Sequence, residues 1–195
     1  MKINIITFFL LFLATVSLRA NEPDSAYVFS YTCGKNNNTA GLNFAWSVDR
    51  ENWHAIGPEF RFLASDFGSW GSQKKMFNPF LFQDNNGLWH CLWTLNDDIQ
   101  QFAHAASTDL YNWKRQSYPE VVEAGNVANI EVAFDEQNKE YTITWMNKNN
   151  GSEKIFKTTT NDFKTYSATE EATKADRLNL RETVRIDGEE QTGVI

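Results

Sequence analysis

The chain has 195 residues and a formal net charge of −7. Its acidic and basic residues are interspersed and form no basic patch, which excludes a nucleic-acid partner because an acidic surface repels phosphate. Aromatic residues are abundant, with 7 Trp, 6 Tyr and 15 Phe.

The first residues have the pattern of a secretory signal peptide. Lys2 supplies a positive charge, residues 3–18 are almost wholly apolar, and Ala20 is a small residue at the cleavage position. We therefore predict a signal peptide over 1–20 and a secreted or periplasmic mature chain of one domain over 21–195. The apolar stretch is short for a membrane span and no second one follows, so we expect no span in the mature chain.

Strand patterns dominate the mature chain. Residues 26–32 are β-branched and aromatic, a turn-forming cluster follows at 34–39, and residues 42–47 alternate as a half-buried strand does. After a loop over 60–76 that is rich in glycine and aromatic residues, we predict a second strand unit over 77–122.

The same order of strands and turns predicts a third unit over 129–166. Residues 168–181 are compatible with one or two helical turns, and a fragment of a further unit begins near Thr173. Helical periodicity is weak elsewhere, which favours an all-β fold.

Two motifs recur along these units. The string SVDRENW at 47–53 returns as STDLYNW at 107–113 and, with one residue inserted, as TTNDFKTY at 159–166. The string NPFLF at 78–82 matches IEVAF at 130–134. Repeats of about 40–60 residues that contain several strands are typical of propeller blades.

We therefore predict a β-propeller of antiparallel blades, with three to four blades present. Propellers close with about four to eight blades. We expect the domain to be incomplete at its C-terminus for this reason.

Tryptophan, cysteine and histidine carry further expectations. We assign the tryptophans inside the repeats to the core: Trp53, Trp89, Trp93, Trp113 and Trp145. Trp70 lies in a loop between glycine and serine and is the candidate for stacking on a sugar ring. Cys33 and Cys91 either form a disulfide or remain separate thiols. The histidines are scattered, so we predict no metal site and no cofactor.

Residues 77–93, 104–113 and 129–135 together resemble the five-bladed propeller glycosidases of glycoside hydrolase family 43. In that family an Arg-Asp-Pro triplet precedes an apolar strand, a turn and a Trp-rich strand, which is the order found over 77–93. Residues 104–113 are similar to its blade-closing turn, and residues 129–135 to the Ala-Pro-Glu motif of its third blade. The resemblance covers most of the mature chain and implies an arabinosidase- or xylosidase-type propeller.

The resemblance places Glu131 at the position of the general acid and Asn78 at that of an orienting aspartate. Inverting glycoside hydrolysis needs one carboxylic acid and one carboxylate base on opposite faces of the sugar. We expect apolar surroundings for Glu131, which would favour the protonated form of an acid, and an Asn78 amide that binds a sugar hydroxyl. The base has no clear counterpart, and Asp66 and Asp24 are the candidates.

These inferences predict an exported glycoside hydrolase-like protein that hydrolyses O-glycosyl bonds in arabinose- or xylose-containing glycans. The expected partner is an oligosaccharide or polysaccharide. A non-catalytic glycan-binding propeller and an inactive truncated product are the alternatives.

Overall fold

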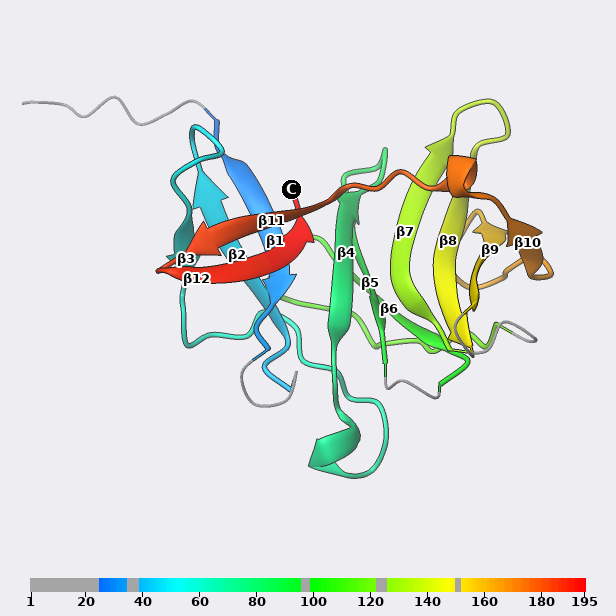
Figure 1. The fold of residues 1–195 in the computed structure, drawn as a ribbon, viewed down its shortest axis with the longest axis horizontal. Helices are drawn as coiled ribbons and strands as arrows, with labels where there is room; N and C mark the ends of the chain where they lie inside the picture. Colours follow the sequence, from blue (N-terminus) through cyan, green and yellow to red (C-terminus); the bar gives the residue numbers. More distant parts are fainter. Residues whose placement is uncertain (1–24, 35–38, 96–98, 122–125, 150–151) are drawn as a thin grey trace, which may run out of the picture.

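Three antiparallel β-sheets stand side by side in the computed structural model of the chain (Figure 1), which describes residues 25–34, 39–95, 99–121, 126–149 and 152–195. The helices that it describes are single 3-10 turns, η2 (Gly71–Gln73) and η3 (Lys174–Asp176), and none of them could cross a membrane. The predicted all-β class with antiparallel blades is confirmed. The predicted signal peptide and Asp24 lie outside the described residues.

Each sheet contains three to five strands. The first has the order β11-β12-β1-β2-β3, with β1 (Tyr27–Thr32), β2 (Leu42–Ser47), β3 (His54–Ile56), β11 (Arg181–Ile186) and β12 (Glu189–Val194). The second has the order β4-β5-β6, with β4 (Phe77–Gln83), β5 (Trp89–Thr94) and β6 (Phe102–Ser107). The third has the order β10-β9-β8-β7, with β7 (Ala128–Asp135), β8 (Glu140–Asn149), β9 (Ser152–Thr160) and β10 (Glu170–Ala172).

A hydrogen-bonded turn of one design follows β2, β6 and β9. In the first copy Asp49 Oδ1 accepts from the backbone N–H groups of Glu51 and Asn52 at 2.9 and 2.8 Å, and the Asn52 amide reaches Asp49 Oδ2 at 2.7 Å. These bonds, led by that of the Asn52 backbone, hold the pKa of Asp49 well below its usual value.

The third copy of this turn corrects the predicted alignment. Thr160 Oγ1 accepts from the Phe163 N–H, as Ser47 Oγ accepts from the Arg50 N–H, and Asp162 takes the place of Asp49. The repeat therefore begins at Thr160, and the inserted residue expected from the sequence is absent. Threonine replaces serine without loss of the turn because both side chains offer the same acceptor oxygen.

A β-bulge near the start of β4 and of β7 corrects the second repeat. Asn78 and Asn129 have left-handed φ angles of 48° and 49°, and the strand register shifts just after each of them. A bulge adds one residue to its strand. Asn78 therefore corresponds to Asn129, and Phe80 to Glu131, whereas the sequence comparison had placed Asn78 opposite Ile130.

These equivalences make β1 the counterpart of β5 and β8, because each is the strand that pairs with the strand before the turn. The counterparts of β4 and β7 in the first sheet come from another part of the chain. The segment 173–180 crosses from β10 to β11 (Figure 1), and β12 then pairs with β1. The fragment predicted from Thr173 thus joins the first sheet and forms no separate blade.

The contact between β12 and β1 is close. Val194 lies opposite Ser30, and the Ser30 hydroxyl donates to the Val194 carbonyl at 3.2 Å. A Cβ atom on Gly193 would lie 2.1 Å from the Ser30 carbonyl oxygen, so only glycine fits at this position.

Of the three apolar clusters among the described residues, two lie between neighbouring sheets and the third belongs to the first sheet alone. Residues that share the space between the first and second sheets are Leu42, Phe44, Met76, Cys91, Trp93 and Ala103. Residues between the second and third are Phe80, Phe102, Ile130, Ile143, Trp145 and Phe163, with Val194 of β12 beside them. Full burial of such side chains stabilises the fold by about 1.5–3 kcal/mol each.

The expectations for tryptophan and cysteine are met in part. Trp53, Trp93 and Trp145 are buried as predicted, whereas Trp89 and Trp113 are only partly covered. Cys33 and Cys91 are separate free thiols, so of the two alternatives the disulfide is wrong. Complete burial raises the pKa of the Cys91 thiol.

Candidate functional site

Glu131 lies at the bulged start of β7 and is only 2% exposed. Its Oε1 atom forms an ion pair with Arg177 Nη2 at 2.9 Å, and its Oε2 atom accepts from the backbone N–H groups of Leu178 and Asn179 at 3.0 and 3.3 Å. All three partners belong to the segment that crosses between the third and first sheets. The carboxylate is therefore buried against a cationic and hydrogen-bonding surface, and the expected apolar surroundings are wrong.

Arg181 connects the two bulges. Its guanidinium donates to the carbonyl oxygens of Asn78 and Pro79 at 2.6 and 3.2 Å, and to that of Ile130 at 3.1 Å. A bulge disrupts the backbone ladder and leaves carbonyl groups in need of donors. One arginine thus holds β4 and β7 together because its planar head offers several donors in a fixed arrangement.

The charge on Arg181 is affected by this position. Burial lowers the pKa of Arg181 to about 10, the negative charge of Glu131 opposes the shift, and the positive charge of Arg177 adds to it. Arg181 remains a cation at neutral pH.

Asn78 takes part in this cluster through its backbone. Its carbonyl oxygen accepts from Arg181, and its left-handed φ angle sets the bulge, a conformation that asparagine adopts more readily than most residues. The structure therefore brings Asn78 and Glu131 together through Arg181. The binding of a sugar hydroxyl by the Asn78 amide stays a prediction.

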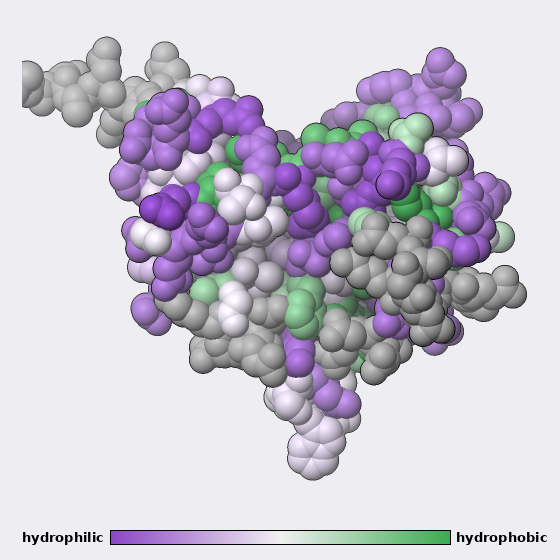
Figure 2. Space-filling view, viewed as in Figure 1, coloured by the Kyte–Doolittle hydropathy of each residue, from purple (hydrophilic) through white to green (hydrophobic). Residues whose placement is uncertain are grey.

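Asp66 and Trp70 lie apart from the hydrogen bonds of this cluster. The Asp66 carboxylate accepts a short hydrogen bond from the Tyr118 hydroxyl, and the Asp66 N–H donates to Gln116 at 3.0 Å. Trp70 precedes η2 in a loop that protrudes at the lower edge of Figures 1 and 2, and its side chain is 73% exposed. Burial, followed by the contact with Asp66, raises the pKa of Tyr118.

We call β4, β7 and β12, which pair with β5, β8 and β1, the inner strands, and equivalent positions on them differ in chemistry. Phe80 faces Leu92, Glu131 faces Thr144, and Val194 faces Ser30 in matching registers. Only one of these three positions carries a carboxylate, and the described residues place no second carboxylate in hydrogen-bonding contact with Arg177 or Arg181. Acid–base hydrolysis by two carboxylates would need its base from Asp66, from Asp24 or from elsewhere.

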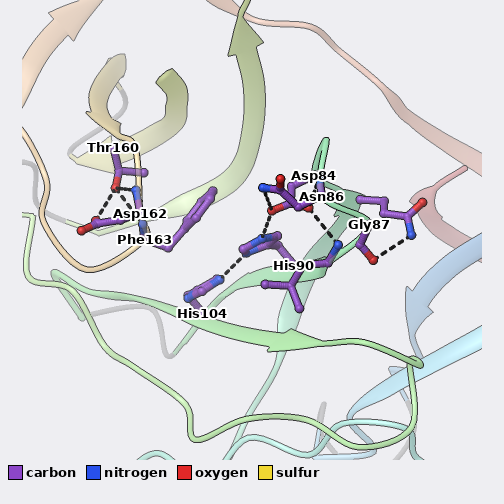
Figure 3. Close-up of polar contacts among 10 residues, drawn as sticks. Asp84, Asn86, Gly87, His90, His104, Thr160, Asp162 and Phe163 are labelled. Atoms are coloured by element: carbon purple, nitrogen blue, oxygen red, sulfur yellow. Dashed lines mark hydrogen bonds and ion pairs between the residues drawn. The ribbon is translucent and has the colours of Figure 1, made fainter. Parts of the chain in front are cut away.

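A second buried polar cluster links the second and third sheets (Figure 3). His90 Nδ1 lies 2.9 Å from His104 Nε2, and His90 Nε2 lies 3.5 Å from Asp84 Oδ2. The carboxylate at Nε2 of His90 fixes the proton on that atom, so Nδ1 accepts from the Nε2–H group of His104. Phe163 covers both imidazoles, with ring centroids 4.4 and 4.8 Å away.

Both histidines of this cluster are held neutral. Burial, with a further contribution from His90, lowers the pKa of His104 to about 3. Burial also lowers the pKa of His90, against the opposing influence of Asp84. Within the described part of the chain no group of three or more His, Cys, Asp or Glu side chains has the arrangement of a metal site.

Sequence reasoning missed Arg177, Arg181 and the histidine pair. The arginines lie in a polar stretch whose only signal is their spacing, and they reach Glu131 across the fold. His90 and His104 have no metal-ligand spacing in the sequence. Their pairing was nevertheless readable, because in adjacent antiparallel strands residue 92 faces residue 104 and residue 90 is its diagonal neighbour.

The fold is similar to that of several solved glycoside hydrolases, which are propeller-type enzymes. An endo-1,4-β-xylanase from Bacteroides thetaiotaomicron superposes with a TM-score of 0.56 at 14% identity, over 84% of this chain and 60% of that one. A glycosyl hydrolase from Bacteroides ovatus gives 0.51 at 16% identity, over 76% and 48%. A Bombyx mori family 32 β-fructofuranosidase gives 0.50 at 14% identity, over 86% and 40%.

These likenesses concern the fold alone, since the identities are low. The chain spans 60% or less of the length of these three proteins. No protein-family model and no curated protein matches the sequence.

Proposed function

We propose that the chain is a glycoside hydrolase-like protein that acts on O-glycosyl bonds of arabinose- or xylose-containing glycans, with Glu131 as the general acid. The observation that supports this role is a single buried carboxylate at the bulged start of an inner strand, in a fold shared with glycoside hydrolases. A general acid needs such a sheltered position to deliver its proton to the leaving oxygen.

The arrangement also defines what must change for Glu131 to act. Arg177 and the N–H groups of residues 178 and 179 occupy both carboxylate oxygens, so the crossing segment has to move before a sugar can reach them. Asn78 would then bind a hydroxyl group of the sugar at Glu131. Trp70 would stack on the ring of another sugar of the same glycan. Asp66 and Asp24 remain the candidates for the base.

Hydrolysis of aryl α-L-arabinofuranosides and β-D-xylosides by the purified mature chain tests the proposal. Glu131→Gln should reduce turnover by about a hundredfold or more, because it removes the proton donor. Glu136→Gln is the matched control, since Glu136 is an exposed glutamate in the turn after β7. Equal turnover by the wild type and Glu131→Gln would contradict the assignment of the acid.

A glycan-binding protein without turnover is the second candidate. Two observations favour it, namely the burial of Glu131 in an ion pair and the apolar residues Phe80 and Val194 at the two equivalent inner-strand positions. Retarded migration in gels that contain arabinoxylan, unaltered by Glu131→Gln and unaccompanied by hydrolysis, would support it.

Export is part of the proposal. The pattern over residues 1–20 predicts cleavage after Ala20. N-terminal sequencing of the protein collected outside the cytoplasm should begin at residue 21, and a sequence that still begins at Met1 would contradict cleavage.

A further inference from the structure

The surroundings of Glu131 carry more positive charge than its carboxylate neutralises. Among the described residues, Glu131 is the only carboxylate paired with Arg177, and Arg181 has no ion-pair partner. The Arg177 side chain is 6% exposed, and Arg177 Nη1 and Arg181 Nε are buried N–H donors without an acceptor. Buried cations and donors of this kind are costly unless an anion meets them.

The crossing segment also has the backbone geometry of an anion receptor. Asn179 has a left-handed φ angle of 53°, and the N–H groups of Leu178 and Asn179 converge on one oxygen of Glu131. Successive N–H groups around a left-handed residue form a concavity that binds anions. Arg177 holds the other oxygen, so the receptor takes a planar carboxylate by both of its oxygen atoms.

We propose that segment 177–181 is a binding site for the carboxylate of an acidic sugar, a uronate, and that Glu131 occupies this site when no ligand is bound. The chemistry of the ligand follows from the occupant that the site already holds. A uronate would take over the contacts of Glu131 with Arg177 and the two N–H groups, and the nearby Arg181 keeps the site cationic whichever carboxylate occupies it. This inference rests on the proposed function, because displacement of Glu131 is the step that would free it to act on a glycan.

The segment is held in a way that allows this exchange. Leu178 and Leu180 are 43% and 47% exposed, so the apolar side chains of the segment contribute little packing. The segment lies along the upper edge of the molecule, where the space-filling view shows a notch between the first and third sheets (Figures 1 and 2). Segments with few buried contacts are the ones that open locally.

Thermal unfolding of the mature chain with sodium D-glucuronate tests the site, with D-glucose in sodium chloride at equal ionic strength as the reference. Glucuronate should raise the Tm in proportion to the logarithm of its concentration, and glucose should not. Arg177→Gln should lower the affinity for glucuronate by about tenfold or more, which is the loss expected for a charged hydrogen bond, so a given rise in Tm should need about ten times more glucuronate. Arg185→Gln, which removes an exposed arginine of β11, should leave it unchanged.

Several results would overturn the inference. These are no rise in Tm with glucuronate, an equal rise with glucose, an effect that survives Arg177→Gln, and an equal effect of sodium acetate, which would show that the sugar is not recognised.

A second variant keeps the test decisive if Arg177→Gln does not fold. Glu131→Gln removes the charge of the internal competitor, so glucuronate should bind more tightly than to the wild type, and unchanged or weaker binding would contradict the site. Binding of glucuronate without any hydrolysis would refute only the proposed enzymatic function. Glu131-dependent hydrolysis of a neutral arabinoside without glucuronate binding would refute only the present inference.

Discussion

The buried histidine pair predicts a loss of stability in mild acid. Because burial lowers the pKa of His104 from 6.5 to about 3, the unfolded chain binds a proton that the folded chain excludes throughout this interval. The stability that neutral His104 contributes is present in full above pH 6.5 and is lost as the pH falls toward the folded value. Within this interval, each unit by which the pH falls lowers the free energy of unfolding by up to about 1.4 kcal/mol.

The expected magnitude at an accessible pH follows directly. Between pH 6.5 and about pH 4.5, His104 alone should lower the free energy of unfolding by roughly 2 kcal/mol, a large share of the roughly 5–15 kcal/mol of a typical domain. The lowered pKa of His90 acts in the same direction. The turn aspartates Asp49 and Asp109, whose pKa values are lowered from 3.8 by hydrogen bonds, cost stability only as the pH falls below that value.

Urea unfolding followed by tryptophan fluorescence measures this dependence, with the buried Trp93 and Trp145 as reporters. His104→Gln should be less stable than the wild type at pH 7 but should lose less stability down to pH 4.5. His54→Gln, which replaces an exposed histidine, should follow the wild type. An equal loss of stability in the wild type and in His104→Gln would refute the reasoning.

Two further predictions concern the contacts of the crossing segment and of β12. Glu131→Leu and Arg177→Met should each destabilise the fold by up to about 3–5 kcal/mol, because each leaves its partner buried and unpaired. The double variant should cost at least about 1 kcal/mol less than the sum of the single variants in urea unfolding, and additive costs would contradict a coupled pair. Gly193→Ala should destabilise by about 1–3 kcal/mol, since its methyl group would collide with the Ser30 carbonyl. Gly71→Ala, which meets no atom within 4 Å, is the control, and equal midpoints for both alanine variants would contradict the close contact.

The strands and the fold class could be predicted because their signals are local. Alternation of apolar and polar residues predicted residues 42–47 as a strand, and the structure has β2 over the same residues. The repeated turns were visible for the same reason, since all the hydrogen bonds of a copy lie within a few residues of its aspartate.

The alignment of β4 with β7 could not be predicted from local sequence patterns. A bulge changes which residues face the core without changing the apolar pattern on either side of it. The left-handed Asn78 and Asn129 are the physical marks of the two bulges, and asparagine is too common in the loops of this chain to single them out.

Of the residues in the candidate site, the sequence pointed to Glu131 and Asn78 and missed the arginines. Glu131 was named as the candidate acid through a resemblance of motifs, and its role stays a prediction. Its partner Arg177 and the neighbouring Arg181 lie about fifty residues further along the chain and reach the start of β7 only because β11 and β12 join the first sheet. The periodicity of a sequence predicts local structure and does not predict a contact between residues that lie so far apart along the chain.

The pairing of β12 with β1 has a consequence for the time course of folding. The two residues joined by the Ser30–Val194 hydrogen bond are 164 positions apart, so the first sheet gains its inner strand only after the second and third sheets have been synthesised. Contacts of such long range slow folding, and until then β1 offers an unpaired edge. A hairpin that arrives late on a crossing segment can also add to the β1 edge of a neighbouring molecule, so we expect exchange of β11 and β12 between chains to be the main misfolding route of this topology.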